Sequence, residues 1–128
     1  MRLLLDTHVF LWLSGAPEKL SPKVLRHCED PANQLYRSQV SPWEMQIKTQ
    51  LGKLELPAPL RELVELQQSR NNLEILPIRL EHIYSLTDLP PHHQDPFDRL
   101  LIAQAQVEDL TFVTVDKQIA NYSVSTLW

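Results

Sequence analysis

The chain has 128 residues, 43% of them hydrophobic, with a formal net charge of −4 and one cysteine, Cys28. This size and hydrophobic content predict one folded domain with one core and exclude a disordered chain. A lone cysteine excludes an internal disulfide and a four-cysteine zinc site, and the acidic balance restricts any nucleic-acid contact to a local one, helped by metal ions or a second subunit.

The first apolar run, residues 3–5, has the pattern of a short strand buried on both faces, as parallel strands are. Thr7 can cap a helix over residues 8–14. Asp6 and His8 interrupt the apolar stretch too early for a signal peptide. No run approaches the roughly 18 apolar residues that a membrane span needs. We therefore expect a cytoplasmic protein that does not enter a membrane.

Helix-start and helix-stop signals follow along the chain. Ser21-Pro22 opens a helix that ends before residue 31, because serine at the cap and proline in the first turn are the preferred pair. Ser41-Pro42 opens a helix that runs to about residue 51 and stops at Gly52. Asp95-Pro96 opens the helix with the clearest apolar side. Further helices are expected over 59–69 and 80–87, and further strands over 34–40, 73–77, 110–115 and 124–127.

Strands that alternate with helices predict an α/β fold, with three layers (α/β/α) and a central parallel sheet of four to five strands. Ligands of such folds bind at the carboxyl ends of the strands. Four acidic residues fall at that edge: Asp6 and Asp116 close strands, and Glu44 and Asp98 open helices. These carboxylates would repel one another unless a divalent cation lay between them. The pattern therefore predicts a metal-dependent phosphoryl-transfer enzyme that uses Mg²⁺ or Mn²⁺, which prefer oxygen ligands.

Each of these acids also has a purely structural interpretation. Asp6 could cap the following helix, Asp98 could interact with the helix dipole, and Asp116 could serve a turn or a cap. The segment Ser41–Glu44 matches a capping box, in which the glutamate bonds back to the serine N–H. Taken alone, Glu44 fits that capping role better. Its position at the same edge as the other acids favours a role in the site.

Several other residues have a simple structural interpretation that we favour. His92 and His93 could bind a transition metal, but paired histidines in a proline-rich loop are more often solvated. Lys48 lies four residues after Glu44, which indicates an ion pair on the helix surface. Trp43 is expected in the core or anchoring its helix rather than as a base-stacking platform. The apolar stripe over 60–66 is expected to be core or dimer surface.

The motifs resemble those of the PIN-domain ribonucleases, and most closely the VapC-type toxins of toxin–antitoxin pairs. The resemblance runs nearly end to end, over the segments 4–8, 38–54, 93–105 and 113–116. The segment 93–105, HQDPFDRLLIAQA, is the most specific of the four. Pro42 departs from the residue expected between the serine and the tryptophan, yet it suits the first turn of a helix.

The resemblance implies a single PIN-like domain over residues 1–128, endoribonuclease activity, a homodimer and inhibition by a cognate antitoxin. It implies a Mg²⁺ or Mn²⁺ site made by Asp6, Glu44, Asp98 and Asp116. Supporting roles, in holding water or phosphate or in contacting RNA, are predicted for Thr7, Ser38, Thr114 and Arg99. Because all four acids are present, we expect an active enzyme.

Two other classes of function compete with a nuclease. A receiver-like signalling domain also gathers acids around Mg²⁺, but it needs adjacent acids after the first strand and an aspartate after the middle strand. Here Thr7 follows Asp6, and the middle strand ends at Pro77. A domain that binds RNA or protein without cleaving it is the second alternative, and metal binding without cleavage of any RNA would identify it.

Overall fold

A computed structural model describes residues 1–71 and 73–128, with the side chain of residue 71 left aside. Its strands form one five-stranded sheet in the order β3-β2-β1-β4-β5, and every neighbouring pair is parallel. The strands are β1 (Arg2–Leu5), β2 (Gln34–Ser38), β3 (Glu74–Leu76), β4 (Thr111–Val113) and β5 (Thr126–Leu127). The expected parallel sheet, with its fifth strand at an edge, is confirmed.

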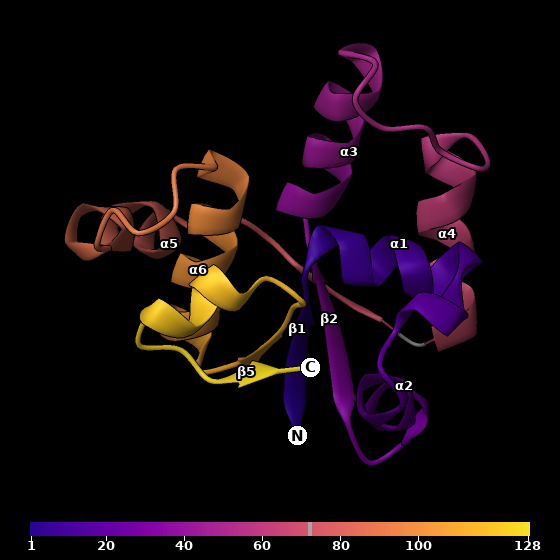
Figure 1. Cartoon of the computed structure of the whole chain (residues 1–128), viewed down its shortest axis with the longest axis horizontal. Helices are drawn as coiled ribbons and strands as arrows, with labels where there is room; N and C mark the ends of the chain where they lie inside the picture. Colours follow the sequence, from indigo (N-terminus) through magenta and orange to yellow (C-terminus); the bar gives the residue numbers. More distant parts are fainter. Residues whose placement is uncertain (72) are drawn as a thin grey trace.

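Helices follow the strands in alternation, as Figure 1 shows. The α-helices are α1 (Thr7–Gly15), α2 (Pro22–Glu29), α3 (Val40–Gln50), α4 (Leu60–Asn71), α5 (Leu80–Ser85) and α6 (Pro96–Glu108). Short 3₁₀ turns are η1 (Pro17–Lys19), η2 (Leu86–Asp88) and η3 (Lys117–Asn121). No helix in the described part of the chain combines the length and the apolar content needed to cross a bilayer.

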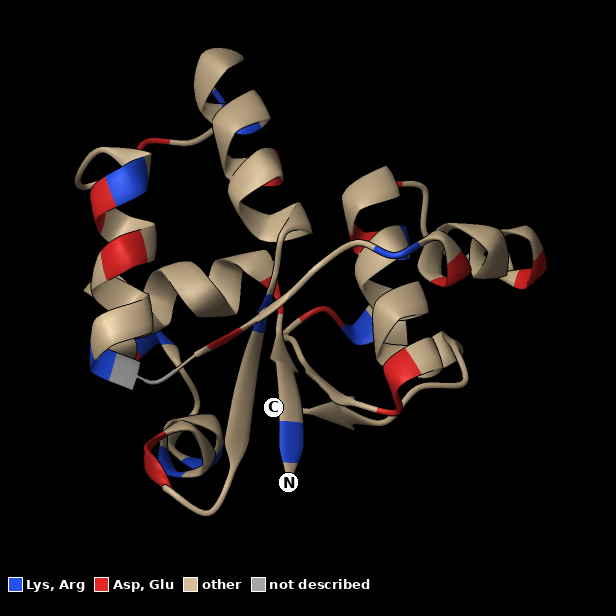
Figure 2. Ribbon diagram, turned by 180° about the vertical axis from the view of Figure 1, so that it is seen from behind, with Lys and Arg blue, Asp and Glu red and all other residues tan. Residues whose placement is uncertain are grey.

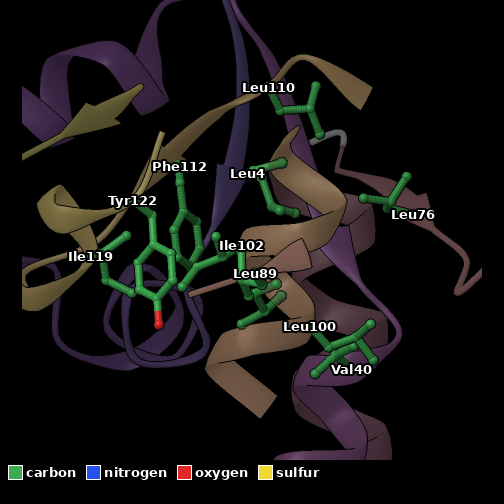
Figure 3. Packing of buried hydrophobic residues seen from close by; sticks show 12 residues of the cluster. Leu4, Val40, Leu76, Leu89, Leu100, Ile102, Leu110, Phe112, Ile119 and Tyr122 are labelled. Carbon is green, nitrogen blue, oxygen red and sulfur yellow. The ribbon is translucent and has the colours of Figure 1, made fainter. Parts of the chain in front are cut away.

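The two faces of the sheet bury two hydrophobic cores, which makes the three layers. Because side chains alternate along a strand, Leu3 and Leu5 of β1 pack toward α1, α2 and α4, whereas Leu4 packs toward α6. Figure 3 shows Leu4 beside Phe112 and Ile102 in this second core. The three-layer α/β/α architecture is therefore confirmed.

The order of the strands creates one crevice at the carboxyl edge. From β1 the chain adds β2 and β3 on one side, and then crosses to β4 and β5 on the other. The direction of winding reverses between β1 and β4, and ligands of open α/β sheets bind at such a point. Leu5 pairs with Val113 in register, and the Asp6 N–H donates to the Val113 carbonyl at 3.0 Å. The residues that follow β1 and β4 therefore start at the same position along the strand direction, next to each other at the carboxyl edge of the sheet.

Local signals placed several helix ends correctly. The Ser21 hydroxyl accepts from the Val24 N–H, and Asp95 accepts from the first-turn N–H groups of α6. Gly52 follows α3 with φ of +72°, a conformation that glycine adopts without steric cost. The predicted cap at Thr7 is wrong: Asp6 occupies the N-cap position without a side-chain cap bond, and Thr7 is already helical.

The observed limits of several strands and helices differ from those expected, most clearly for β2, β4 and α3. β2 ends at residue 38 and β4 at residue 113, where 40 and 115 were expected. α3 begins at Val40, with Gln39 at the N-cap position, and the Ser38 hydroxyl accepts from the Val40 N–H at 3.0 Å. Ser41 therefore lies inside the helix and cannot act as its cap. The predicted capping box at Ser41–Glu44 is consequently wrong.

Candidate metal centre

Asp6 and Thr114 face each other across the ends of β1 and β4. The Thr114 hydroxyl donates to Asp6 Oδ2 at 2.7 Å, and the same hydroxyl oxygen accepts from the Asp116 N–H at 3.1 Å. Asp6 is only 7% exposed. Burial raises the pKa of the Asp6 carboxyl above its ordinary value, although the hydrogen bond from Thr114 acts in the opposite direction. Thr114 therefore orients a carboxylate that its surroundings disfavour as an anion.

Glu44 lies on the first turns of α3, where it reaches the start of α1. The Thr7 hydroxyl donates to Glu44 Oε1 at 2.6 Å, and Thr7 Oγ1 also lies 3.1 Å from the Ser41 hydroxyl oxygen. The other carboxylate oxygen forms an ion pair with Lys48, one turn along the helix. The ion pair predicted for Lys48 is present. It is no mere surface pair, however, because Glu44 is only 2% exposed.

Lys48 brings the positive charge of this region. Its ammonium lies 3.6 Å from Asp95 Oδ2 as well as against Glu44. Burial lowers the pKa of the Lys48 ammonium, but the hydrogen bond and charge of Glu44 outweigh burial and raise the pKa above its ordinary value. Lys48 thus stays charged and neutralises part of the acidic edge.

Asp98 is the acid that its surroundings perturb most clearly. Burial, followed by the negative charges of Asp6, Asp95 and Glu44, raises the pKa of Asp98 to about 8, and Lys48 only partly offsets this. Since these charges act on Asp98 through space, the structure brings Asp6, Glu44 and Asp98 into one electrostatic neighbourhood. Asp6 follows β1, Glu44 lies on α3 and Asp98 lies on α6, so three separate elements meet here.

Asp116 joins this neighbourhood through His93. Its Oδ1 accepts from the Gln118 N–H at 2.9 Å, so the cap interpretation is correct for that oxygen. Its Oδ2 lies 3.0 Å from His93 Nε2, and Asp98 Oδ2 lies 3.1 Å from the same nitrogen. The solvated role expected for His93 is wrong, because its side chain is 14% exposed and contacts two acids. His92, by contrast, is exposed.

The other predicted supporting residues have contacts of their own. Ser38 donates to Gln104 and accepts from the Val40 N–H, and no contact with the four acids is recorded for it within the described residues. The guanidinium of Arg99 donates to the carbonyls of Leu89, Pro90 and His93, so it holds the loop before α6. A contact of Arg99 with RNA stays a prediction.

Trp43 does not lie in the core, and its contact with Phe97 of α6 fits the other expected role, that of anchoring its helix. Its side chain is 50% exposed and packs edge-on against Phe97 of α6, with ring centroids 5.0 Å apart. The indole is therefore exposed to solvent, beside the first turns of α3 and α6, which carry Glu44 and Asp98. In the stripe over residues 60–66, Leu63 is buried whereas Leu66 is 40% exposed, so the stripe is only partly core.

The donor set fits a divalent cation. Carboxylate and hydroxyl oxygens are the ligands that Mg²⁺ and Mn²⁺ prefer. Burial and neighbouring negative charges raise the pKa values of Asp6 and Asp98, and a bound dication would favour their charged forms. His93, Asp98 and Asp116 also offer ligand atoms within 4.8 Å of one another. We call Asp6, Glu44, Asp98 and Asp116 the carboxylate centre.

Fold and site together define a three-layer α/β protein with a cluster of acidic residues at the switch point of its sheet. A family model described as the PIN domain matches residues 3–124, so the chain belongs to the PIN-domain family. Members of this family are nucleases, hydrolases that act on nucleic acids, and they generally bind divalent metals. A comparison with curated protein sequences finds no match.

Solved structures with the same fold include complexes named VapBC. VapBC2 from Rickettsia felis, bound to a promoter DNA fragment, is 16% identical with a TM-score of 0.73, over 99% of this chain and 98% of that one. DNA-bound VapBC from Salmonella typhimurium is 14% identical with a TM-score of 0.70, over 99% and 97%. VapBC-1 from nontypeable Haemophilus influenzae is 18% identical with a TM-score of 0.63, over 99% and 97%. At these identities the similarity shows the fold.

Proposed function

We propose that this protein is a Mg²⁺- or Mn²⁺-dependent endoribonuclease and the toxin of a toxin–antitoxin pair. One observation carries the proposal: Asp6 after β1, Glu44 on α3 and Asp98 on α6 meet at one edge of the sheet, where burial first, and then the charges of the neighbouring acids, raises the pKa of Asp98 to about 8. A site that concentrates negative charge in this way suits a dication and, through it, a phosphodiester. Membership of a nuclease family supports the same chemistry.

Each residue of the carboxylate centre has a proposed role. Asp6 and Asp98 would hold the metal, Glu44 would hold a second metal or position a water molecule, and Asp116 would complete the set. The bound ion would orient the scissile phosphate and lower the pKa of a water molecule for in-line attack. Thr114 keeps Asp6 in place and Thr7 keeps Glu44 in place, through hydrogen bonds of 2.7 and 2.6 Å.

The proposed substrate is single-stranded RNA, not a long double-stranded nucleic acid. The net charge is −4, and Figure 2 shows basic residues dispersed among acidic ones over several elements. A protein of this charge makes few of the phosphate contacts on which non-specific duplex binding depends. The exposed ring of Trp43 beside the centre suits an unpaired base, since bases of single strands stack on aromatic side chains.

The antitoxin and the homodimer are proposed from similarity and charge. A structure of the same fold from Mycobacterium tuberculosis is named as a member of the VapBC family of toxin–antitoxin systems, and an acidic chain suits a basic protein partner. A short basic protein encoded beside this chain would be the first candidate. Co-purification of the two proteins, and light scattering of this chain alone, test the partner and the dimer separately.

Sequencing of RNA ends tests the activity. Purified protein is incubated with total RNA in Mg²⁺, in Mn²⁺ or in chelator, and wild type is compared with Asp6→Asn. We expect metal-dependent new ends from wild type only. The matched control is Asp88→Asn, which changes an exposed aspartate of η2 and should leave the ends unchanged.

Two outcomes contradict this assignment. If the Asp6→Asn variant still cleaved RNA, Asp6 would not be a residue of the catalytic site. Metal binding without cleavage of any RNA would identify the domain as a non-cleaving binder instead.

A further inference from the structure

His93 is held between two acids that come from different elements. Its Nε2 lies 3.1 Å from Asp98 Oδ2 at the start of α6 and 3.0 Å from Asp116 Oδ2 after β4. By spacing alone, these three residues could together ligate a metal ion. Whether the imidazole is a ligand or a hydrogen-bond donor depends on which ring nitrogen carries the proton.

The second ring nitrogen settles the tautomer. The Asp95 N–H donates to His93 Nδ1 at 3.1 Å, so Nδ1 must present its lone pair. A neutral imidazole with a lone pair on Nδ1 carries its proton on Nε2, the nitrogen that faces the acids. Coordination of a metal through Nε2 would require the opposite tautomer, in which the Nδ1 proton would point at the Asp95 N–H. The backbone therefore favours His93 as a donor over His93 as a ligand.

The loop that carries His93 is fixed from both sides. The His93 N–H donates to the Tyr122 hydroxyl at 2.7 Å, which ties the loop to the end of η3. The Arg99 guanidinium donates to the His93 carbonyl at 3.3 Å and to the Pro90 carbonyl at 2.8 Å. With backbone and ring both held, the Nε2–H occupies one defined position.

We propose that His93 is a positioning residue of the carboxylate centre: its Nε2–H donates to Asp116 Oδ2 while the same nitrogen lies against Asp98 Oδ2, which sets the spacing of the two acids, and the imidazole itself does not ligate the metal. The inference rests on the proposed metal-dependent function and adds a residue to it. One ring nitrogen placed between two carboxylates from separate elements fixes their relative position, and it contacts only the Oδ2 atom of each, so that Asp98 Oδ1 faces no part of His93. Residues that orient ligands in this way raise metal affinity without touching the ion.

Mn²⁺ titration of the full chain, followed by calorimetry, tests the positioning role. We expect His93→Ala to weaken Mn²⁺ binding about 10- to 100-fold, the usual loss when a ligand-orienting partner is removed. His93→Gln should restore most of the affinity, because its amide N–H reaches about as far as the Nε2–H. His92→Ala, which changes the exposed neighbour, should bind Mn²⁺ like wild type. Equal affinity in wild type and His93→Ala would overturn the proposal.

Two spectroscopic measurements separate donor from ligand. In metal-free protein, ring ¹⁵N shifts should show His93 protonated on Nε2, and protonation on Nδ1 would overturn the inference. With Mn²⁺ bound, electron spin-echo spectra should lack coupling to a directly bound ¹⁴N of His93, and such coupling would make it a ligand. If wild type neither binds Mn²⁺ nor cuts RNA, the proposed function fails, and the ¹⁵N shifts still decide the donor assignment.

Discussion

Among single residues, burial and mutual repulsion determine how the acids of the carboxylate centre ionise. Asp6 and Asp98 come from different elements, yet both have pKa values above the ordinary range, and for both the first cause is burial. A raised pKa means that the folded, metal-free protein disfavours the charged form. At neutral pH the Asp98 carboxyl of the metal-free protein is therefore mostly protonated, and a bound metal would displace that proton.

Asp98 makes the stability of the metal-free protein depend on pH. Its carboxyl titrates near 3.8 as a free group and at about 8 in the fold. Between these pH values the folded state binds more protons than the unfolded state, so the free energy of unfolding falls as the pH rises. In chelator we expect a loss on the order of a few kcal/mol between about pH 4 and about pH 8. Denaturant unfolding at several pH values measures this loss.

The variant Asp98→Asn provides the control for that pH dependence. An amide does not titrate, so the variant should lose less stability than wild type as the pH rises. Asp88→Asn should keep the wild-type slope, because Asp88 is exposed. A wild-type slope in Asp98→Asn would show that another group causes the pH dependence. Added Mn²⁺ should stabilise wild type more at high pH, where protons no longer compete for the acids.

Thr114→Val tests the hydroxyl that orients Asp6. The change removes the 2.7 Å donor to Asp6 and leaves the Asp116 N–H without its acceptor. An unsatisfied buried group costs about 1–3 kcal/mol, so denaturant unfolding should show a loss of that order. Mn²⁺ binding should weaken as well. Thr87→Val, at an exposed position of η2, should change neither quantity, and a matching loss there would point to a general effect of threonine removal.

At the scale of elements, the first turn of α6 combines a structural cap with a residue of the site. Asp95 accepts from the Phe97 N–H at 2.8 Å and from the Asp98 N–H at 3.3 Å, and Pro96 fills the first helical position. The cap fixes the backbone from which Asp98 projects. The negative charge of Asp95 also raises the pKa of Asp98, by less than burial and the charge of Asp6 do. Capping and site geometry are thus coupled in this helix.

Asp95→Ala and Ser21→Ala separate these two effects. Each removes an N-cap side chain, from α6 and from α2, and each should cost about 0.5–2 kcal/mol of stability in denaturant unfolding. Only Asp95→Ala should also change Mn²⁺ affinity, because α6 carries Asp98 whereas α2 carries no acid of the centre. Equal Mn²⁺ affinity in both variants would show that the position of Asp98 does not depend on its cap.

For the whole molecule, the strand order gathers the acids while the net charge stays negative. The winding reverses between β1 and β4, so that Asp6 and Asp116, 110 positions apart in sequence, reach one crevice. The helices on either side of this crevice, α3 and α6, pack against each other and bring Glu44 and Asp98 to it. Figure 1 shows α3 and α6 rising on either side of the end of β1.

A negative protein with a metal centre should bind RNA through the metal more than through a basic surface. We expect binding of a short single-stranded RNA to depend strongly on divalent metal and only weakly on monovalent salt. Fluorescence anisotropy with the Asp6→Asn variant and wild type, in Ca²⁺ and in chelator over a salt series, measures both dependences. Tight, steeply salt-dependent binding in chelator would contradict this view and would indicate a basic surface.

The sequence by itself determined the features that depend on neighbouring residues. The caps at Ser21 and Asp95 and the stop at Gly52 were correct, because each bonds or turns within a few residues of its own position. The alternation of strands and helices determined the parallel sheet, and the sheet put the four acids on one edge.

Only the tertiary structure decided the contacts between distant segments. Glu44 fitted a capping box in sequence, but α3 starts before Ser41, which removes the cap position. The Glu44 carboxylate accepts instead from the Thr7 hydroxyl of α1. His93 had the pattern of a solvated loop residue, although its place just before a helix at the carboxyl edge was a usable signal. Trp43 was expected in the core or as an anchor of its helix, and it lies half exposed against α6. Side-chain contacts between separate elements depend on how those elements pack, and no local pattern encodes that packing.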